Sequence, residues 1–182
     1  MKSKTIYILC GLPGSGKSTW AKEKVKEQNT VIICRDAIRT MIKGNYFFDK
    51  EYELLVEACT NSSFREAIRQ NYNIIIDETN ISKIRRNMWL NDINFYSEFD
   101  TNDKVIISKE TWKNVIDINK NDNYKTILVW FKEHINNLDN RVKNDKGISK
   151  ETWKNIIENM QTCFEPPSIE EGFDEIIEIE RT

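Results

Sequence analysis

One segment near the N-terminus constrains the fold more than any other. Residues 11–18 read GLPGSGKS and follow directly on the apolar run TIYILC. A glycine-rich turn between a buried strand and a helix, closed by Lys and Ser, is typical of the P-loop that cradles nucleotide phosphates. Gly11, Gly14 and Gly16 permit backbone conformations that let successive N–H groups converge on phosphate oxygens. A glycine turn without chemical consequence is the alternative, and the strand before it and the helical pattern after it argue against that alternative.

The polar residues that close this turn have distinct expected roles. The helix that begins near Lys17 directs the positive end of its dipole at the phosphates, and the Lys17 ammonium bridges the β- and γ-phosphates. The Ser18 hydroxyl is a ligand for Mg²⁺. We therefore expect ATP and Mg²⁺ to bind here. The expected ATP contacts are Gly11, Leu12, Pro13, Gly14, Ser15, Gly16, Lys17, Ser18, Thr19 and, from a later segment, Arg141.

Length and charge limit the class of protein. The 182 residues predict one domain, and the net charge of -2 excludes a generally basic protein that coats nucleic acid, although a local basic pocket stays open. No apolar run approaches the roughly 20 residues that span a bilayer, and no signal peptide precedes the first strand, so we expect no membrane partner and a cytoplasmic location. The four cysteines lack CxxC spacing and are predicted to be buried thiols in a reducing compartment.

Short apolar runs alternate with helical patterns along the chain. Runs without strict polar alternation suit strands that are covered on both faces, and their alternation with helices predicts an α/β fold with a mostly parallel sheet. The predicted strands are Ile6–Cys10, Val31–Cys34, Ile74–Asp77, Thr126–Phe131 and Glu175–Ile179.

Two helices are predicted around the third strand. The first has an expected inward face formed by Tyr52, Leu55, Val56, Cys59, Ser63 and Ala67. The second begins at Ser82, whose hydroxyl can cap the first turn, and carries Arg85 and Arg86.

A long polar connection near residues 97–123 is predicted to be an insertion. It contains the segment ISKETWKN at Ile107–Asn114, which recurs at Ile148–Asn155. Two copies are too few for a solenoid, so we interpret them as a local duplication in which Ser108 and Ser149 begin helices. A pair of equivalent partner-binding helices is the alternative.

The segment CRDAIR follows the second strand and places Asp36 and Arg39 at the edge of the sheet that faces the ligand crevice. A hydroxyl that attacks a γ-phosphate needs a carboxylate to take its proton, and Asp36 is the leading candidate. Arg39 lies one helical turn later and suits an acceptor phosphate. The alternative is a helix cap at Asp36 and a solvated charge at Arg39.

The third strand ends in IIIDETN, which places Asp77 at the tip of a strand expected beside the P-loop strand. A carboxylate there orients Mg²⁺ or its water shell. Thr79 and Asn80 are expected either to bind the acceptor or to fix the loop. A loop-capping acid is the alternative role for Asp77.

Residues 136–146, NNLDNRVKNDK, predict a polar helix that runs into a loop. A cation on such a lid can stabilise the transferring phosphoryl group, and Arg141 is the candidate because its guanidinium grips two oxygens. A solvated helix end is the alternative.

His134, the single histidine, is interpreted as structural, and the five tryptophans as packing groups.

The segments GLPGSGKS, CRDAIR, IIDETN, the arginine-bearing lid and the C-terminal FEPPSIEEGFDEIIEI together resemble the polynucleotide 5′-hydroxyl kinase branch of the P-loop kinases. The resemblance covers almost the whole chain except the part near 97–123. It implies a single domain over 1–182 with a P-loop αβα sandwich and a helical lid near 133–161. It also implies transfer of the ATP γ-phosphate to a 5′-OH end of DNA or RNA, as in nucleic acid repair.

The resemblance also implies roles for single residues. The general base falls on Asp36, the acceptor-phosphate arginine on Arg39 and a lid arginine on Arg141, whereas a second lid arginine falls near Asp145 or Lys146, a departure from the family pattern. The expected acceptor-binding residues are Arg35, Arg39, Glu78, Thr79, Asn80 and Arg85. A small-molecule kinase for nucleosides, sugars or nucleotide sugars is one alternative function, and a non-catalytic nucleotide-binding module is the other.

Overall fold

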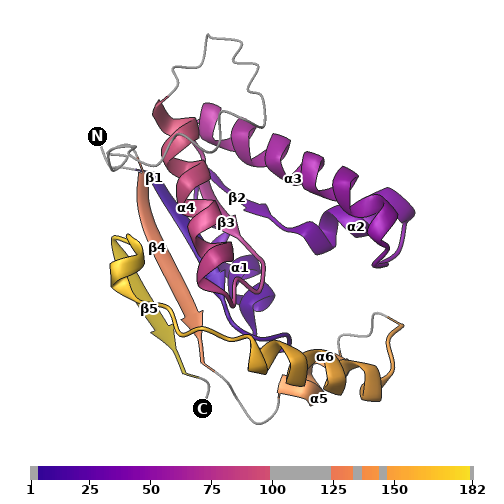
Figure 1. The fold of residues 1–182 in the computed structure, drawn as a ribbon. Coiled ribbons are helices and arrows are strands. Elements are labelled where there is room, and N and C mark those ends of the chain that lie inside the picture. Colours follow the sequence, from indigo (N-terminus) through magenta and orange to yellow (C-terminus); the bar gives the residue numbers. More distant parts are fainter. Residues whose placement is uncertain (1–3, 99–123, 133–136, 144–146, 181–182) are drawn as a thin grey trace.

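The computed structural model describes residues 4–98, 124–132, 137–143 and 147–180, and Figure 1 shows its fold. The strands are β1 (Lys4–Cys10), β2 (Thr30–Ile33), β3 (Asn73–Ile76), β4 (Tyr124–Phe131) and β5 (Glu175–Ile179). The helices are α1 (Lys17–Lys24), α2 (Arg35–Lys43), α3 (Lys50–Arg69), α4 (Lys83–Glu98), α5 (Asn137–Lys143) and α6 (Lys150–Thr162), with a short 3₁₀ turn at Ile169–Glu171.

The five strands form one sheet in the order β2-β3-β1-β4-β5, and every pairing in it is parallel. All five predicted strands are confirmed, with ends that shift by at most two residues. The second strand ends at Ile33 because Cys34 already serves as the N-cap of α2. The predicted α/β class is therefore confirmed.

The two faces of the sheet bury different side chains. Ile6 and Ile8 of β1 pack in a cluster with Phe64 and Trp89 of α3 and α4, whereas Leu9 packs on the opposite face with Ala21 of α1. Successive side chains of a strand point to opposite faces, so one apolar run supplies both clusters. Helices on both faces give the three-layer arrangement that the resemblance implied.

The predicted inward face of α3 is partly wrong. Val56 and Ala67 are buried as expected, but Leu55 is 49% exposed and Ser63 is exposed. The buried stripe instead runs through Val56, Thr60, Phe64 and Ala67, a set with helical spacing that is rotated from the predicted one. The buried Thr60 is tolerated because its hydroxyl donates to the Val56 carbonyl at 2.7 Å.

The predicted cap of α4 is confirmed, since the Ser82 hydroxyl accepts from the Arg85 N–H at 3.3 Å. Arg86, the second arginine of this helix, is part of the interior. Arg86 is fully buried and forms two hydrogen bonds of 2.7 Å to the Glu171 carboxylate. Its Nη1 also donates to the carbonyls of Asn80 and Glu165, so one guanidinium ties α4 to the segment that precedes β5.

The second copy of ISKETWKN begins a helix as predicted, because the Ser149 hydroxyl caps α6 by accepting from the Thr152 N–H at 3.1 Å. The first copy with Ser108, the insertion near 97–123, His134, Asp145 and Lys146 lie outside the described residues.

The prediction of buried thiols holds for Cys10 but is wrong for Cys163, which is exposed at the end of α6; Cys34 and Cys59 are partly buried.

None of the helices in the described ranges is long and apolar enough to cross a membrane.

Candidate active site

The candidate site lies at the carboxyl ends of the strands, around the turn that follows β1. The chain passes from β1 outward to β2, returns to β3 and then crosses to β4 on the other side of β1. Crevices at such a reversal of strand order are where parallel α/β sheets bind ligands. In Figure 1, α5 and α6 lie beyond the tips of the strands, across from α2.

The P-loop glycines are required by close contacts as well as by their backbone conformation. Gly14 has a φ of 80°, and a Cβ at this position would lie 2.0 Å from the carbonyl oxygen of Asn137. A Cβ on Gly11 would lie 2.8 Å from the carbonyl oxygen of Phe131. The first contact brings the start of α5, the predicted lid, directly against the phosphate-binding turn.

Lys17 is buried and folds back over its own loop. Its ammonium donates to the carbonyl oxygens of Gly11 and Leu12 at 2.8 Å each and to the Ser15 hydroxyl at 3.3 Å. Burial lowers the pKa of Lys17 to about 8, and the nearby Asp77 carboxylate partly opposes this shift. Bound phosphates would offer the ammonium stronger, charged partners than the two carbonyls.

Asp36 lies in an ion-pair network at the start of α2. Its Oδ1 accepts from Arg39 Nη1 at 2.7 Å, and Arg39 also forms two hydrogen bonds of 2.8 Å with the carboxylate of Glu53 on α3. This bidentate contact raises the pKa of Arg39 and lowers the pKa of Glu53. Sequence reasoning missed Glu53, which fixes the guanidinium that faces Asp36.

Arg141 approaches Asp36 from α5. Its Nη2 lies 3.9 Å from Asp36 Oδ2, and its guanidinium stacks on the Trp153 ring of α6 at 4.1 Å. Burial lowers the pKa of Arg141, and its buried Nε has no hydrogen-bond partner among the described residues. The structure thus brings together Asp36, Arg39 and Arg141, as predicted, and adds Trp153 as a support that the sequence did not indicate.

The loop after β3 carries three of the predicted acceptor residues, and their contacts differ. Glu78 accepts from Arg85 Nη2 at 3.0 Å, while its other oxygen is buried without a partner among the described residues. The Thr79 carbonyl accepts from the Gly11 N–H, which ties this loop to the P-loop.

Asn80 is not available to an acceptor. Its side chain is buried, donates to the Leu9 carbonyl at 2.8 Å and accepts from Trp89 Nε1 at 3.2 Å. Its φ of 43° is the left-handed conformation that Asn tolerates better than most residues. Of the two roles expected for Asn80, the structure therefore supports fixing the loop. The prediction that the Asn80 side chain binds the acceptor is not supported, because that side chain is already hydrogen-bonded.

Ser18 and Asp77 are expected to hold Mg²⁺ together with oxygens of the bound nucleotide. Ser18 lies exposed on the first turn of α1, and Asp77 lies close enough to Lys17 to oppose part of the burial-induced lowering of the Lys17 pKa. The described part of the chain contains no cluster of three or more His, Cys, Asp or Glu side chains that could hold a metal ion. Mg²⁺ commonly uses one or two protein oxygens together with substrate phosphates and waters, so Ser18 and Asp77 fit that pattern.

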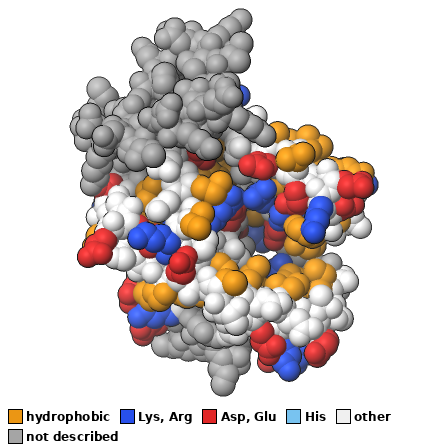
Figure 2. All heavy atoms as spheres, viewed as in Figure 1, with side chains coloured by type: hydrophobic (Ala, Val, Ile, Leu, Met, Phe, Trp, Pro, Cys, Tyr) orange, Lys and Arg blue, Asp and Glu red, His pale blue; other side chains and the backbone are white. Residues whose placement is uncertain are grey.

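Charged side chains gather in the hollowed centre of the face shown in Figure 2, where basic groups lie beside acidic ones. Three arginines lie near the candidate site, namely Arg35 and Arg39 of α2 and Arg85 of α4. Each of these arginines is paired with a carboxylate, so this part of the molecule carries charges of both signs.

Comparison with known proteins identifies the family. The AAA domain family (AAA_33) matches residues 6–167, which include the P-loop, the CRDAIR and DETN segments and the lid helices. The chain belongs to this family. Its fold, with the parallel sheet and the P-loop after β1, is that of P-loop kinases.

Two curated relatives match shorter parts of this AAA domain. An L-seryl-tRNA(Sec) kinase from Methanococcus maripaludis is 31% identical over 109 residues, which cover 57% of this chain and 40% of the relative. A 2′,3′-cyclic-nucleotide 3′-phosphodiesterase from Pongo abelii is 36% identical over 84 residues, which cover 45% of this chain and 19% of the relative. The matched regions therefore span less than half of either relative.

Solved structures share the fold at lower identity. A chain of the Pnkp1/Rnl/Hen1 RNA repair complex superposes with a TM-score of 0.62 at 22% identity, over 90% of this chain and 46% of that chain. A fungal RNA kinase superposes with a TM-score of 0.55 at 14% identity, over 98% of this chain and 75% of that chain. At these identities the likeness concerns the fold alone.

Proposed function

We propose that this AAA domain is an ATP-dependent polynucleotide 5′-hydroxyl kinase that transfers the ATP γ-phosphate to a 5′-OH end of DNA or RNA. The observation that carries the proposal is the Asp36 carboxylate, which is held by Arg39 at 2.7 Å and faces Arg141 at 3.9 Å beside the P-loop. A carboxylate between two cations at the mouth of a phosphate-binding loop suits a base that acts on an acceptor hydroxyl.

In the proposed reaction the 5′ oxygen attacks the γ-phosphorus while Asp36 accepts its proton. The new oxygen–phosphorus bond forms as the bond to the β,γ-bridging oxygen breaks, and ADP leaves with that electron pair. Lys17 and Arg141 stabilise the negative charge on the phosphoryl oxygens. Mg²⁺, held by Ser18 and Asp77 with the phosphates, would supply further charge neutralisation when bound. Stacking on Trp153 keeps the Arg141 guanidinium oriented and limits its freedom.

The basic residues around Asp36 favour an acceptor that carries phosphate. Arg35 and Arg85 line one pocket, where they lie 3.7 Å and 3.0 Å from the carboxylates of Glu53 and Glu78. A phosphate group would offer either guanidinium two parallel hydrogen bonds in place of its carboxylate partner. One relative supports an acceptor that belongs to a nucleic acid, since the L-seryl-tRNA(Sec) kinase is named for a substrate carried on tRNA. We infer that a few such contacts hold a single-stranded or short end.

An acceptor panel tests the proposal. The protein is incubated with γ-labelled ATP and Mg²⁺ and with RNA and DNA oligonucleotides bearing a 5′-OH, free nucleosides, or sugars. We expect label on the 5′-OH oligonucleotides and none on matched oligonucleotides that already carry a 5′-phosphate. Label confined to nucleosides or sugars would establish a small-molecule kinase instead. Release of inorganic phosphate alone would indicate a nucleotide-binding module that hydrolyses ATP.

A further inference from the structure

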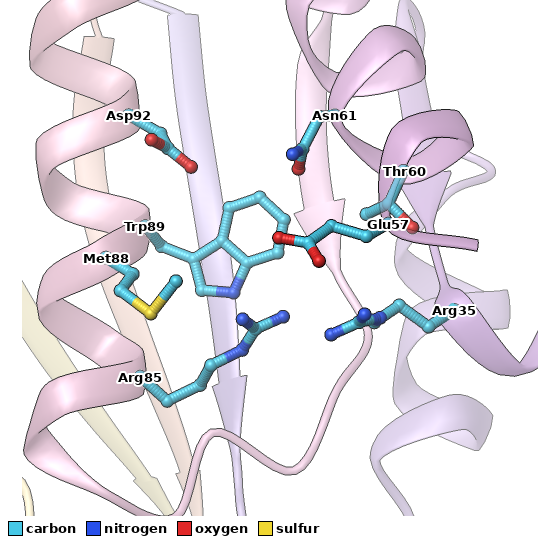
Figure 3. A pocket seen from close by; sticks show the side chains of 8 residues that line it. All are labelled: Arg35, Glu57, Thr60, Asn61, Arg85, Met88, Trp89 and Asp92. Carbon is cyan, nitrogen blue, oxygen red and sulfur yellow. The ribbon is translucent and has the colours of Figure 1, made fainter. Parts of the chain in front are cut away.

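A pocket of about 200 Å³ opens between α3 and α4, beside the candidate active site. Figure 3 shows Arg35 and Arg85 at one end of it, Asn61 and Asp92 toward the other, and the Trp89 indole and the Glu57 carboxylate between them. The volume is several times the roughly 30 Å³ share of one water. It lies below the roughly 300–1,000 Å³ of pockets that take drug-sized ligands. A single ring system is therefore the size of group that it can hold.

The arginine end of the pocket adjoins the proposed base. Arg35 Nη2 lies 3.7 Å from Glu53 Oε2, the same oxygen that accepts from Arg39 Nη2 at 2.8 Å. Arg39 in turn holds Asp36. The Nε of Arg35 is buried and has no hydrogen-bond partner in the described part of the chain, so a ligand group that reached it would satisfy this donor. An acceptor whose hydroxyl reaches Asp36 would thus extend past Arg35 into the pocket.

The far end of the pocket offers hydrogen-bond acceptors. Asp92 is partly buried, and no hydrogen bond or ion pair joins it to another described residue. Burial raises the pKa of Asp92 to about 7; Arg85 of the same helix opposes the shift, and Glu57 of α3 adds to it. The Asp92 carboxylate can therefore accept hydrogen bonds from a ligand that enters the pocket.

We propose that this pocket binds the base of the acceptor's terminal nucleotide and that Asp92 accepts a hydrogen bond from the exocyclic amino group of that base. The inference rests on the proposed function and names the specificity of the same site. A base combines a flat apolar face, which the 45% exposed Met88 can contact, with a polar edge that suits Asp92. The Trp89 indole is 2% exposed and forms a wall of the pocket. The sugar and phosphate then lie toward the two arginines, since a phosphate among Glu57 and Asp92 would be repelled.

Terminal-base preference tests this inference. The measurement is kcat/KM for 5′-OH oligonucleotides that differ only in the terminal base, at pH 8.5, where the Asp92 carboxylate is charged and can only accept hydrogen bonds. We expect adenine, cytosine or guanine to be preferred over uracil or thymine by about 10-fold, the usual worth of a hydrogen bond to a charged group. Asp92→Leu should reduce this ratio to about one, and Asp92→Asn should leave an intermediate ratio.

Asn91→Leu is the matched control, because Asn91 is exposed on the same helix and does not line the pocket. It should keep the wild-type ratio. Wild-type protein that phosphorylates every terminal base equally, or an Asp92→Leu variant that keeps the preference, would overturn the inference while the kinase activity itself stands. Absence of transfer to any 5′-OH oligonucleotide would instead overturn the proposed function, and this inference with it.

Discussion

Asp36→Asn is expected to lower the rate of phosphate transfer to a 5′-OH oligonucleotide by about 10²–10⁴-fold, the usual contribution of a positioned general base. The amide keeps the size of the side chain and can still accept from Arg39, but it cannot take the proton of the acceptor hydroxyl. The ATP dissociation constant, measured by calorimetry with a non-hydrolysable analogue, should stay within about twofold, because the carboxylate acts on the acceptor and not on the nucleotide.

Asp139→Asn makes the same chemical change on the lid helix and is the matched control. Asp139 pairs with Lys150 on the surface and has no contact with the Asp36 network. Its transfer rate should equal that of the wild type. Full turnover by Asp36→Asn would remove the proposed base, and a large loss of ATP affinity would mean that Asp36 mainly shapes the nucleotide site.

Arg86→Met should destabilise the protein by about 3–5 kcal/mol, the usual cost of removing one partner of a buried ion pair. The guanidinium and the Glu171 carboxylate are 0% and 2% exposed, so the variant leaves a buried charge without its partner. It also leaves the carbonyls of Asn80 and Glu165 without a donor. Urea unfolding gives the free energy of unfolding for both proteins.

Arg69→Met tests whether this cost comes from burial. Arg69 also forms a bidentate contact with a carboxylate, that of Glu66, but both side chains are about half exposed. The urea midpoint of the Arg69→Met variant should remain close to the wild-type value, because solvent screens exposed ion pairs. Combining Arg86→Met with Glu171→Leu should recover part of the lost stability, since the second change removes the unpaired charge. An Arg86→Met variant as stable as Arg69→Met would contradict the structural role of the pair.

Local sequence signals predicted the framework of the fold. Each strand is a short apolar run bounded by polar residues, and the turn at 11–18 needs glycines and a lysine at fixed spacing, so both can be recognised within a few residues. The caps at Ser82 and Ser149 depend on side chains next to the backbone groups that they satisfy. These features depend on neighbours in the chain, and the structure has them where the sequence predicts them.

Features that depend on distant contacts were not predictable. Glu53 lies 14 residues beyond Arg39 on another helix, and nothing in its local sequence distinguishes it from the other acids of α3. Arg86 follows Arg85 in a polar stretch, yet only Arg86 meets Glu171, which lies 85 residues later. The inward face of α3 was misplaced because apolar residues such as Leu54 and Leu55 occur on its exposed side. Helical spacing shows which residues share one face of a helix, but packing against the sheet determines which of those faces is buried.

The central claim is that the acceptor hydroxyl lies between the γ-phosphate and Asp36. A crystal structure with a non-hydrolysable ATP analogue, Mg²⁺ and a short 5′-OH oligonucleotide measures this directly. We predict a distance of about 2.6–3.2 Å between the 5′ oxygen and an Asp36 carboxylate oxygen, with the γ-phosphorus in line on the other side. A 5′ oxygen bound outside hydrogen-bonding reach of Asp36, with the γ-phosphate directed elsewhere, would contradict the account.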